Sequence, residues 1–275
     1  MPELPEVETV RRGLIPVLQD EVLIDVQTFR EDLRYPFPPF FVERLKGQTV
    51  KNLERRAKYL LLHLNDDQTV IIHLGMSGRF RIDSVKTFLK QKHDHVIFQT
   101  PHHTIAYNDA RRFGLMDLTP TQMWPDHIHF NNLGPEPFDQ TFDSERFHKS
   151  LSNRHQSIKV ALLDQQLIAG VGNIYASESL WQSGINPHRS AGSLTLKEAA
   201  KLLTNIRDVL NRAIEAGGST LRDHQQPDGK LGYFQHQFSV YNRHIEPCLH
   251  PGCKGDIKKI SQTGRSTFYC ERCQR

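Results

Sequence analysis

The chain has 275 residues, a hydrophobic content of 37% and a formal net charge of +4. This length accommodates two domains, and the composition excludes a disordered or low-complexity chain. Its densest apolar runs, Tyr59–Leu62 and Val70–Ile72, have the length of strands and are far too short to cross a bilayer. The acidic, proline-containing start is unlike a secretory signal. We therefore expect a soluble intracellular protein.

The positive charge is concentrated at the C-terminal end. Residues 222–275 contain nine Lys or Arg against five Asp or Glu, a difference that equals the whole net charge. A basic segment indicates an anionic partner, with nucleic acid as the first candidate. A solvated charged surface explains the same count equally well, so charge alone leaves both interpretations open.

The first predicted element is a helix that begins within the opening residues. Pro5 suits a first helical turn, and the glutamates around it suit the positive end of the helix dipole. Val7, Val10, Leu14 and Val17 recur at helical spacing and define a buried face. The start of the chain is therefore expected to lie close to the protein body.

From about Val22 to Leu118 the pattern favours short strands separated by turn residues, which predicts a β-sandwich. Two of these runs, Tyr59–Leu64 and Thr69–Leu74, flank Asn65-Asp66-Asp67 and predict a hairpin. Further β-prone runs are His95–Gln99, Thr104–Tyr107 and Phe113–Leu118.

The second half of the chain has a helical pattern. Thr195 and Glu198 fit a capping box, and apolar residues then keep helical spacing until Gly217-Gly218 ends the helix. Another helical pair is expected around Ala169–Tyr175. The glycines of this turn lack the third glycine and the βαβ context of a nucleotide loop, and a helix–two-turn–helix that contacts phosphate is the better interpretation.

All four cysteines lie in the last 28 residues, as Cys248-x4-Cys253-x16-Cys270-x2-Cys273. Clustered cysteines in an intracellular chain favour a metal over disulfides. Two pairs at this spacing predict one tetrahedral Zn²⁺, with a structural role because no catalytic acid accompanies the cysteines. A redox-active CxxC or simply reduced thiols are the alternatives, and His250 inside the first pair could compete as a ligand. Arg265, on the hairpin between the pairs, suits phosphate binding.

Pro2 is the unusual residue at the other end of the chain. Removal of Met1 would leave a secondary amine with a pKa of ~7.7–8, a better resting nucleophile than a lysine at ~10.4. Such an amine can attack a sugar C1′, expel the base and form a Schiff base, with Glu3 as the general acid. Taken alone, Pro2 and Glu3 are explained more simply as the lead into a helix.

Seven blocks of the sequence, from Pro2 to the final Cys-Gln, occur together in one order. They are Pro2-Glu3-Leu4-Pro5-Glu6-Val7-Glu8, Arg56-Ala57-Lys58-Tyr59-Leu60, His73-Leu74-Gly75-Met76-Ser77-Gly78, Lys92-His93-Asp94-His95-Val96, Asp109-Ala110-Arg111-Arg112-Phe113-Gly114, Gly172-Asn173-Ile174-Tyr175-Ala176-Ser177-Glu178 and the cysteine-rich tail. Together they resemble the bacterial formamidopyrimidine-DNA glycosylases (the Fpg/MutM family). Leu4 is similar to this branch rather than to the sister endonuclease VIII branch, which carries Gly there.

The resemblance implies a bifunctional DNA glycosylase and AP lyase of base-excision repair that acts on double-stranded DNA. It would excise oxidised purines (8-oxoguanine and formamidopyrimidines) and then carry out β,δ-elimination at the abasic site. Pro2 would form the Schiff base, Glu3 would donate the proton and Glu6 would support the site. Lys58 matches the lysine of β-elimination and Arg265 the finger arginine of δ-elimination.

The resemblance also implies a set of DNA contacts. A base must leave the duplex before its C1′ can be attacked, and apolar or planar side chains suit the space it vacates. Met76, Arg111 and Phe113 match the residues that enter that space. Further matched DNA-contacting residues are His73, His93, Lys159 and Asn173.

Pattern and resemblance together predict an α+β fold of two domains. The first is an N-terminal catalytic β-sandwich with flanking helices, and the second a helical helix–two-turn–helix domain with a four-cysteine zinc-finger β-hairpin. The predicted boundaries are 1–118 for the catalytic domain, 119–142 for a linker, 143–222 for the helix–two-turn–helix domain and 239–273 for the zinc finger. The expected protein is a monomer without a membrane partner, in the bacterial cytoplasm at the nucleoid.

Two positions depart from the family pattern. The first cysteine pair is separated by four residues rather than two, which puts the shape of that zinc turn in question. A lysine common four residues before the position of Lys159 is here His155, so that DNA contact is not carried over.

Two other functions compete with this interpretation: a preference for oxidised pyrimidines, and a non-catalytic damage-binding protein with a zinc ribbon. The stretch Ser219–Tyr233, rich in Gly, Gln and Asp, is predicted to form a mobile loop over the extruded base.

Overall fold

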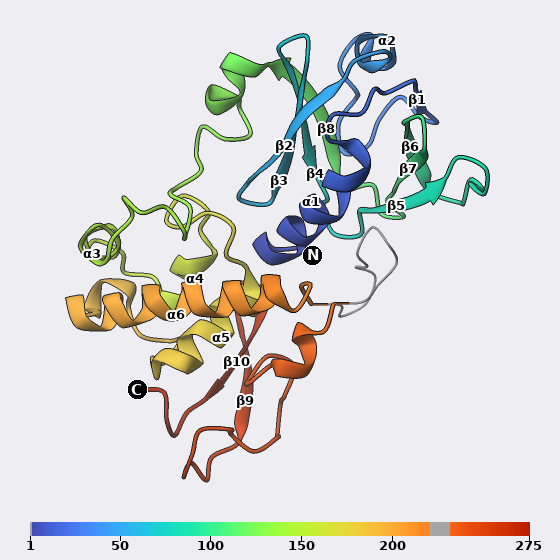
Figure 1. The fold of residues 1–275 in the computed structure, drawn as a ribbon. Coiled ribbons are helices and arrows are strands. Elements are labelled where there is room, and N and C mark those ends of the chain that lie inside the picture. The colour runs from blue at the N-terminus through green and yellow to red at the C-terminus, as the bar shows by residue number, and fades with distance from the viewer. Residues whose placement is uncertain (1, 220–231) are drawn as a thin grey trace. The chain divides into compact units, whose positions relative to one another are not determined.

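The computed structural model of the chain describes residues 2–219 and 232–275 (Figure 1). The chain divides into two compact units, residues 1–131 with 216–233 and residues 132–215 with 234–275. The four-part division expected from the sequence stays a prediction. Most of the predicted loop Ser219–Tyr233 lies in 220–231, outside the described residues. Among the residues described, no helix combines the length and apolar character needed to cross a membrane.

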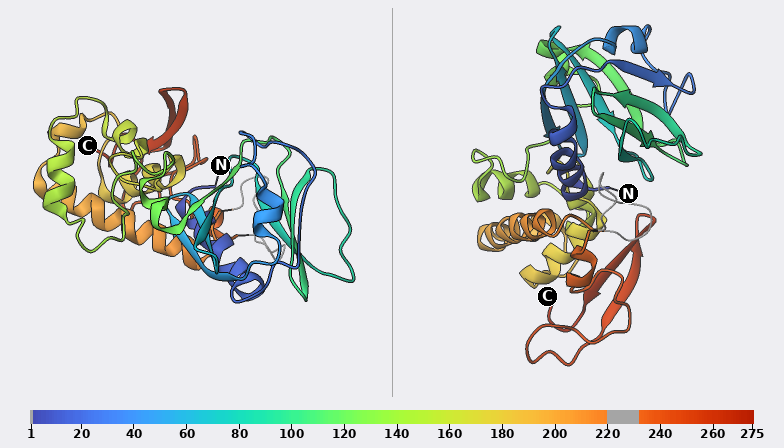
Figure 2. Two further views of the ribbon diagram at one scale, coloured as in Figure 1. Left: turned by 90° about the horizontal axis from the view of Figure 1, so that it is seen from above. Right: turned by 45° about the vertical axis from the view of Figure 1, so that its right-hand side comes forward.

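The first unit contains two four-stranded antiparallel sheets, the sandwich expected from the sequence (Figure 2). One sheet has the strand order β1-β6-β7-β5 and the other has the order β2-β3-β4-β8. The strands are β1 (Asp25–Thr28), β2 (Val50–Arg56), β3 (Tyr59–Leu64), β4 (Gln68–His73), β5 (Arg79–Ser84), β6 (Asp94–Gln99), β7 (His103–Asn108) and β8 (Leu115–Pro120). Two helices and a 3-10 turn complete the unit: α1 (Leu4–Leu18), α2 (Phe41–Leu45) and η1 (Thr121–Asp126).

Helix α1 begins and packs as its sequence predicts. Glu3 is its N-cap, with Pro5 in the first turn. The predicted face of Val7, Val10, Leu14 and Val17 is buried in the core of the unit. Each such side chain contributes about 1.5–3 kcal/mol when it leaves water, and this packing holds the start of the chain against β2 and β3.

The predicted hairpin is present as β3 and β4, with a one-residue shift at the start of β4. The strand predicted at Phe113–Leu118 begins two residues later, at Leu115. Phe113 and Gly114 belong instead to the preceding loop, where the backbone N–H of Gly114 donates to the Asp109 carboxylate at 2.9 Å. The Gly114 N–H is therefore bonded to a side chain and not to the backbone carbonyl of a neighbouring strand.

The second unit is helical, with a two-stranded antiparallel hairpin at its C-terminal end. The capping box of α6 is formed, because the Thr195 backbone N–H donates to Glu198 at 2.8 Å and the Glu198 N–H donates to Thr195 Oγ1 at 3.3 Å. The helix ends at Glu215, before Gly217 and Gly218, which both have positive φ. The elements are α3 (Ser144–Leu151), α4 (Ile158–Leu163), α5 (Asn173–Ser183), η2 (Ala191–Ser193), α6 (Leu196–Glu215), η3 (Phe234–Gln237), β9 (Ile257–Gln262) and β10 (Arg265–Cys270).

Candidate active site and nucleic-acid interface

The start of the chain is fixed by the carboxylate of Glu6. Its Oε2 accepts the backbone N–H of Glu3 at 2.9 Å, and its Oε1 accepts both the backbone N–H and the hydroxyl of Ser219, each at 2.9 Å. Pro2, Glu3 and Glu6 are all buried. Since both oxygens are used, Glu6 joins the residue after Pro2 to a segment 213 positions away.

Gly218 is required beside this carboxylate. Its φ is +78°, and an added Cβ would lie 3.3 Å from both Cγ and Oε1 of Glu6. The predicted stop of α6 at Gly217-Gly218 therefore has a second purpose, because it lets Ser219 approach Glu6.

Lys58 lies on a two-residue turn between β2 and β3, where Arg56 pairs with Tyr59. Ala57 takes the left-handed conformation, with φ of 53°, and Lys58 itself is buried. Arg55 supports the turn, because its Nη1 donates to the Ala57 carbonyl at 3.1 Å. The Arg55 Nε lies 3.3 Å from the Glu8 carboxylate, which connects this turn to helix α1.

Glu8 is thus a supporting residue that the sequence reasoning missed. Burial raises the pKa of its carboxyl group, but hydrogen bonds from Arg11 and Arg12 and the charge of Arg55 outweigh burial, and the net shift is downward. Glu8 is therefore ionised near neutral pH, and it bonds Arg11, Arg12 and Arg55 simultaneously.

His73 ends β4 and has a defined tautomer. Its Nδ1 accepts the backbone N–H of Gly75 at 3.0 Å, which leaves the proton of a neutral ring on Nε2. Burial, followed by the charges of Lys58 and Arg34, lowers the pKa of His73 to about 4. At neutral pH His73 is therefore an uncharged hydrogen-bond donor.

Asp109 organises the two loops that carry the predicted gap-filling residues. Its carboxylate has no exposed surface. Oδ1 accepts Ser77 Oγ at 2.5 Å and the Arg111 N–H at 3.3 Å, while Oδ2 accepts the Gly114 N–H at 2.9 Å and the Tyr107 hydroxyl at 3.3 Å. The loop after β4 and the loop before β8 are consequently held together by one side chain.

The backbones of these two loops also touch directly. Gly75 has φ of +64°, and a Cβ there would lie 2.3 Å from the carbonyl carbon of Phe113, so only glycine fits. His93, itself at φ of 74°, accepts the Asp109 N–H through its carbonyl at 3.1 Å. The site therefore rests on close backbone approach as well as on side chains.

Met76, Arg111 and Phe113 are brought together at this surface. Met76 is 40% exposed and Phe113 is 43% exposed, although both are large apolar side chains. The Arg111 guanidinium lies 4.8 Å from the centre of the Phe113 ring. These two apolar side chains and the guanidinium lie on loops that Asp109 holds together, and they form a candidate contact surface.

In the second unit, Lys159 and Asn173 form one pair. Lys159 Nζ donates to Asn173 Oδ1 at 2.6 Å, and Lys159 has no exposed surface. Asn173 is the first residue of α5, and its Nδ2 donates to the Ser266 carbonyl at 2.8 Å. Lys159 therefore supports Asn173 in this structure, and the direct contact of either residue with DNA stays a prediction.

Arg265 is exposed at the start of β10, directly after the hairpin turn. Thr263 and Gly264 form this turn with φ of 47° and 74°, the pattern of a type I′ hairpin. The hairpin is fixed to the helical part of the unit, because Gln262 Nε2 donates to Ser157 Oγ at 3.1 Å. The position of Arg265 within the second unit is therefore well defined.

The four predicted zinc ligands converge. The Sγ atoms of Cys248, Cys253, Cys270 and Cys273 all lie within 4.8 Å of one another. The pairs Cys248–Cys273 and Cys253–Cys270 are 3.6 and 3.7 Å apart. A tetrahedron with Zn–S bonds of about 2.3 Å has edges of about 3.8 Å, so the thiolates have the spacing that a zinc ion requires.

The unusual spacing of the first cysteine pair is absorbed by a turn. The Cys253 N–H donates to the His250 carbonyl at 3.0 Å, and Gly252 takes φ of +74°. The His250 side chain is not one of the four converging ligands, and its Nδ1 lies 3.3 Å from Cys273 Sγ. Trp181 Nε1 donates to Cys248 Sγ at 3.4 Å in the same way. His250 is thus an outer hydrogen-bond partner of the thiolates.

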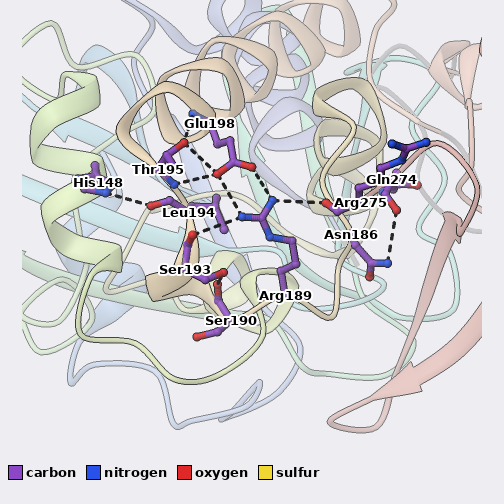
Figure 3. Close-up of polar contacts among 10 residues, drawn as sticks. All are labelled: His148, Asn186, Arg189, Ser190, Ser193, Leu194, Thr195, Glu198, Gln274 and Arg275. Atoms are coloured by element: carbon purple, nitrogen blue, oxygen red, sulfur yellow. Dashed lines mark hydrogen bonds and ion pairs between the residues drawn. The ribbon is translucent and has the colours of Figure 1, made fainter.

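The far end of the zinc finger is anchored to α6 (Figure 3). Arg189 forms a bidentate pair with Glu198, at 2.5 and 3.1 Å, and this pairing lowers the pKa of Glu198 to about 2. The Arg275 carbonyl accepts the Asn186 N–H at 3.0 Å and Arg189 Nη1 at 3.4 Å. The residues after Cys273 are thereby held by the segment that precedes α6.

The near end of the finger is anchored by Glu178 in the middle of α5. Its carboxylate accepts the backbone N–H groups of Ser239, Val240 and Tyr241, at 2.8–3.0 Å. Burial raises the pKa of Glu178, against the opposing effect of these hydrogen bonds. Glu178 was part of a quoted block but was not predicted as a site residue.

Comparison with known families agrees with these two units. Residues 1–116 match the formamidopyrimidine-DNA glycosylase N-terminal domain, residues 133–225 match the H2TH domain of the same enzymes, and residues 246–275 match the zinc finger found in FPG and IleRS. Together these matches define a zinc-finger DNA glycosylase.

Whole-chain relatives carry the comparison further. The formamidopyrimidine-DNA glycosylases of Ruegeria pomeroyi and Beijerinckia indica are 48% and 50% identical, each over 100% of both chains. The Lactococcus lactis Fpg bound to DNA with an abasic site is 34% identical, with a TM-score of 0.89 over 99% of both chains. The same protein bound to DNA with an oxidised pyrimidine has a TM-score of 0.90 at 34% identity, over 100% of both chains.

The chain belongs to the formamidopyrimidine-DNA glycosylase family. It is therefore a DNA glycosylase of base-excision repair with an associated AP lyase activity. Its four cysteines hold one structural zinc ion.

Proposed function

We propose that Pro2, once Met1 has been removed, is the nucleophile that excises oxidised purines from double-stranded DNA. The observation that supports this most strongly is the buried carboxylate of Glu6, which fixes the backbone of Glu3 directly after Pro2. A flexible chain start would lose the orientation that covalent catalysis needs. Helix α1, anchored in the core, supplies the rigid base for it.

The reaction follows from the chemistry of a secondary amine. The Pro2 nitrogen attacks C1′ of the extruded nucleotide, the bond from C1′ to the base breaks, and the base leaves with the electron pair and a proton. Glu3 protonates the sugar ring oxygen as the ring opens, so that an iminium between Pro2 and C1′ results. Two elimination steps then release the 3′ and 5′ phosphates and leave a one-nucleotide gap.

We assign the elimination steps to Lys58 and Arg265. Lys58, on a buried and well-braced turn, would contact phosphate and assist β-elimination. Arg265 is exposed at the tip of the zinc-held hairpin, where a guanidinium can bind phosphate through two hydrogen bonds. It would hold the phosphates at the lesion and assist δ-elimination.

We assign recognition of the opened duplex to the first unit. Met76, Arg111 and Phe113 would fill the space that the extruded nucleotide leaves, since an apolar chain, a guanidinium and a ring can stack there. His73, neutral at pH 7 because its pKa is lowered to about 4, would donate a hydrogen bond to phosphate without charge repulsion of Lys58. His93 would contact the same backbone, and Asn173, supported by Lys159, would do so from the second unit.

Borohydride trapping tests the nucleophile. The purified chain, shown by intact mass to lack Met1 and by metal analysis to hold zinc, is mixed with a duplex that contains 8-oxoguanine opposite cytosine. We expect a covalent adduct on the N-terminal peptide at Pro2. The matched control is Glu3→Gln, which should bind the duplex but trap slowly, because Pro2 is intact and the proton donor is lost.

The experiment also distinguishes the competing function. A damage-binding protein without catalysis would bind the duplex and give no adduct, and Pro2→Gly would leave its behaviour unchanged. That outcome, from a protein of confirmed mass and zinc content, would overturn the proposal.

Lesion preference needs a separate measurement. We propose oxidised purines as the main substrates, although the Lactococcus lactis relative has been crystallised with an oxidised pyrimidine in its DNA. Excision rates for 8-oxoguanine and thymine glycol, measured in matched duplexes, decide between the two preferences. Faster excision of thymine glycol would assign the chain to the pyrimidine-directed alternative.

We also propose that the protein acts as a monomer in the bacterial cytoplasm, associated with the nucleoid. Its relatives come from bacteria, and its substrate is chromosomal DNA. Sedimentation of the purified protein and imaging of a C-terminal fluorescent fusion against a DNA stain test the two statements separately. A dimer in the first, or exclusion from DNA in the second, would contradict them.

A further inference from the structure

The described residues contain two groups of side chains that could hold a metal ion, and the structural zinc of the cysteines accounts for only one of them. The second group is Asp117, His127 and His129, in the first unit. The geometry points to a second metal site at these three residues, which would bind Zn²⁺ or a similar first-row divalent cation. Two imidazoles and a carboxylate are a ligand set that zinc accepts, with the remaining position taken by water.

The ligand atoms of the three residues all lie within 4.8 Å of one another, and the two separations that involve Asp117 are close to the edge of a coordination tetrahedron. Asp117 Oδ2 lies 3.4 Å from His127 Nε2 and 3.6 Å from His129 Nε2. Both are ion-pair distances, longer than a good hydrogen bond of about 2.7–3.2 Å. A tetrahedral ion with bonds of about 2.0–2.1 Å has ligand-to-ligand edges of about 3.3 Å, which is close to the observed separations.

Asp117 presents one oxygen to this site. Its Oδ1 accepts the backbone N–H of Leu118 at 2.9 Å, so the carboxylate is oriented and Oδ2 faces both imidazoles. Strand β8 fixes the backbone of Asp117, which pairs with Ile71 of β4. A carboxylate held in this way loses little freedom when it binds a cation.

The two histidines are held on a short, tightly turned segment after η1. The His127 carbonyl accepts the backbone N–H groups of Phe130 and Asn131 at 2.7 and 3.1 Å. Ile128, between the histidines, is 76% exposed, whereas each imidazole is only 18% exposed. Both rings therefore point inward towards Asp117 while the residue between them points to solvent.

The aromatic neighbours make this segment rigid. The His129 ring stacks on Tyr59 at 6.0 Å, and the buried Phe130 packs against the same tyrosine at 5.0 Å. The backbone N–H of His129 donates to His127 Nδ1 over a long 3.5 Å. Metal binding at Nε2 would place the ring proton on Nδ1 and break this one weak contact.

A bound metal ion would connect β8 to the end of residues 1–131, the first of the two segments of this unit. The second unit begins at Asn132, three positions after His129. A cation at Asp117, His127 and His129 would therefore fasten the segment through which the chain leaves the sandwich. The expected role is structural, because none of the residues assigned to the reaction belongs to this group. The Tyr59 ring, which stacks on His129, also packs against His73, one of the proposed DNA contacts.

Metal binding by the complete, zinc-loaded protein tests the inference. The protein is prepared without a histidine tag and dialysed against micromolar Zn²⁺, and bound zinc is measured by mass spectrometry and titration calorimetry. We expect one zinc per chain beyond the ion held by the cysteines. Loss of an outer-shell partner already weakens metal sites by roughly 10–100-fold, so His127→Gln/His129→Gln should weaken this second binding by more than about 100-fold.

The matched control is His102→Gln/His244→Gln, which removes two exposed histidines outside the group. It should bind the second zinc as the unmodified protein does. Co²⁺ provides an independent readout, because cobalt at these ligands absorbs without the thiolate charge-transfer band of a cysteine site. If the double variant does not fold, Asp117→Asn, which keeps the side-chain shape, takes its place.

Three results would overturn the inference. The first is a single zinc per chain at saturation, and the second is unchanged binding in His127→Gln/His129→Gln or in Asp117→Asn. The third is an equal loss in the His102→Gln/His244→Gln control, which would identify non-specific surface binding. A rise in the thermal midpoint with added zinc in the unmodified protein, absent in His127→Gln/His129→Gln, would support it.

Discussion

Asp109→Asn is expected to loosen the surface that carries Met76, Arg111 and Phe113 while it preserves the shape of the side chain. The Asp109 carboxylate is fully buried and accepts four hydrogen bonds, two on each oxygen. An asparagine must turn an NH₂ group towards one of these pairs. Each pair contains one backbone N–H, from Arg111 or from Gly114, which cannot turn away as a hydroxyl can.

The magnitude follows from that geometry. One buried N–H left without an acceptor costs about 1–3 kcal/mol, and the remaining bonds lose the contribution of the charge. A total of roughly 2–4 kcal/mol would lower the thermal midpoint of the first unit by about 5–15 °C, at about 2–4 °C per kcal/mol.

Two assays separate loop order from general instability. Thermal unfolding gives the stability, and single-turnover kinetics at a temperature where the variant is folded give excision of 8-oxoguanine and cleavage of a preformed abasic site. Excision should fall more than cleavage, because a preformed abasic site has no base to extrude. Asp66→Asn, on the exposed turn between β3 and β4, is the matched control. An Asp109→Asn protein that unfolds within a degree of the unmodified chain and excises the base normally would refute this reasoning.

Three further predictions concern other parts of the site. Glu8→Gln should destabilise the first unit at pH 7. The difference should shrink as the pH falls below 4.5 and through the lowered pKa of Glu8, because the carboxylate stabilises the fold only while it is ionised. Thermal midpoints across pH measure this, and a pH-independent difference would contradict it. The pKa of His73 is lowered from 6.5 to about 4, so the unfolded chain binds a proton between these pH values and the free energy of unfolding decreases as the pH falls through them. The NMR signals of the His73 ring should stay unchanged from pH 8 down to about 5. Titration of the ring near pH 6.5 would show that burial does not lower its pKa. Chelation of the cysteine-bound zinc should unfold the hairpin that carries Arg265 and abolish DNA incision, and added zinc should restore it. Circular dichroism follows the unfolding, and formation of the one-nucleotide gap follows the activity. Full activity after complete removal of the zinc would rule out its structural role.

Much of the fold could be predicted because its signals are local. The start of α1, the β3–β4 hairpin and the capping box of α6 each depend on residues within a few positions of one another. The zinc site is similarly local, since the two cysteine pairs lie on neighbouring turns of one hairpin. The strand pattern also predicted the sandwich, whereas the order of strands in each sheet depends on long-range pairing that no short pattern contains.

The candidate site was predicted mainly from resemblance, and apart from Glu6 the residues that hold it in place were not predicted as such. Glu8, Asp109 and Glu178 are charged residues, which sequence patterns place on the surface by default. Their burial becomes favourable only when backbone N–H groups or guanidinium groups from distant segments surround them. Lys159 illustrates the same difficulty, because the sequence did not predict that its ammonium group is buried against Asn173; its contact with DNA, implied by the resemblance, stays a prediction.

Three loops of this protein are held in the same way, by the carboxylates of Glu6, Asp109 and Glu178. Each is a buried carboxylate that accepts backbone N–H groups from other segments, at Ser219, at Arg111 with Gly114, and at Ser239–Tyr241. A carboxylate accepts from several directions and donates in none, so it can hold a loop whose backbone groups all point inward. The corresponding amide cannot do this, because one of its two ends is a donor. The most conservative substitutions in volume, Glu to Gln and Asp to Asn, should therefore disturb the loops of this enzyme more than many larger changes at its surface.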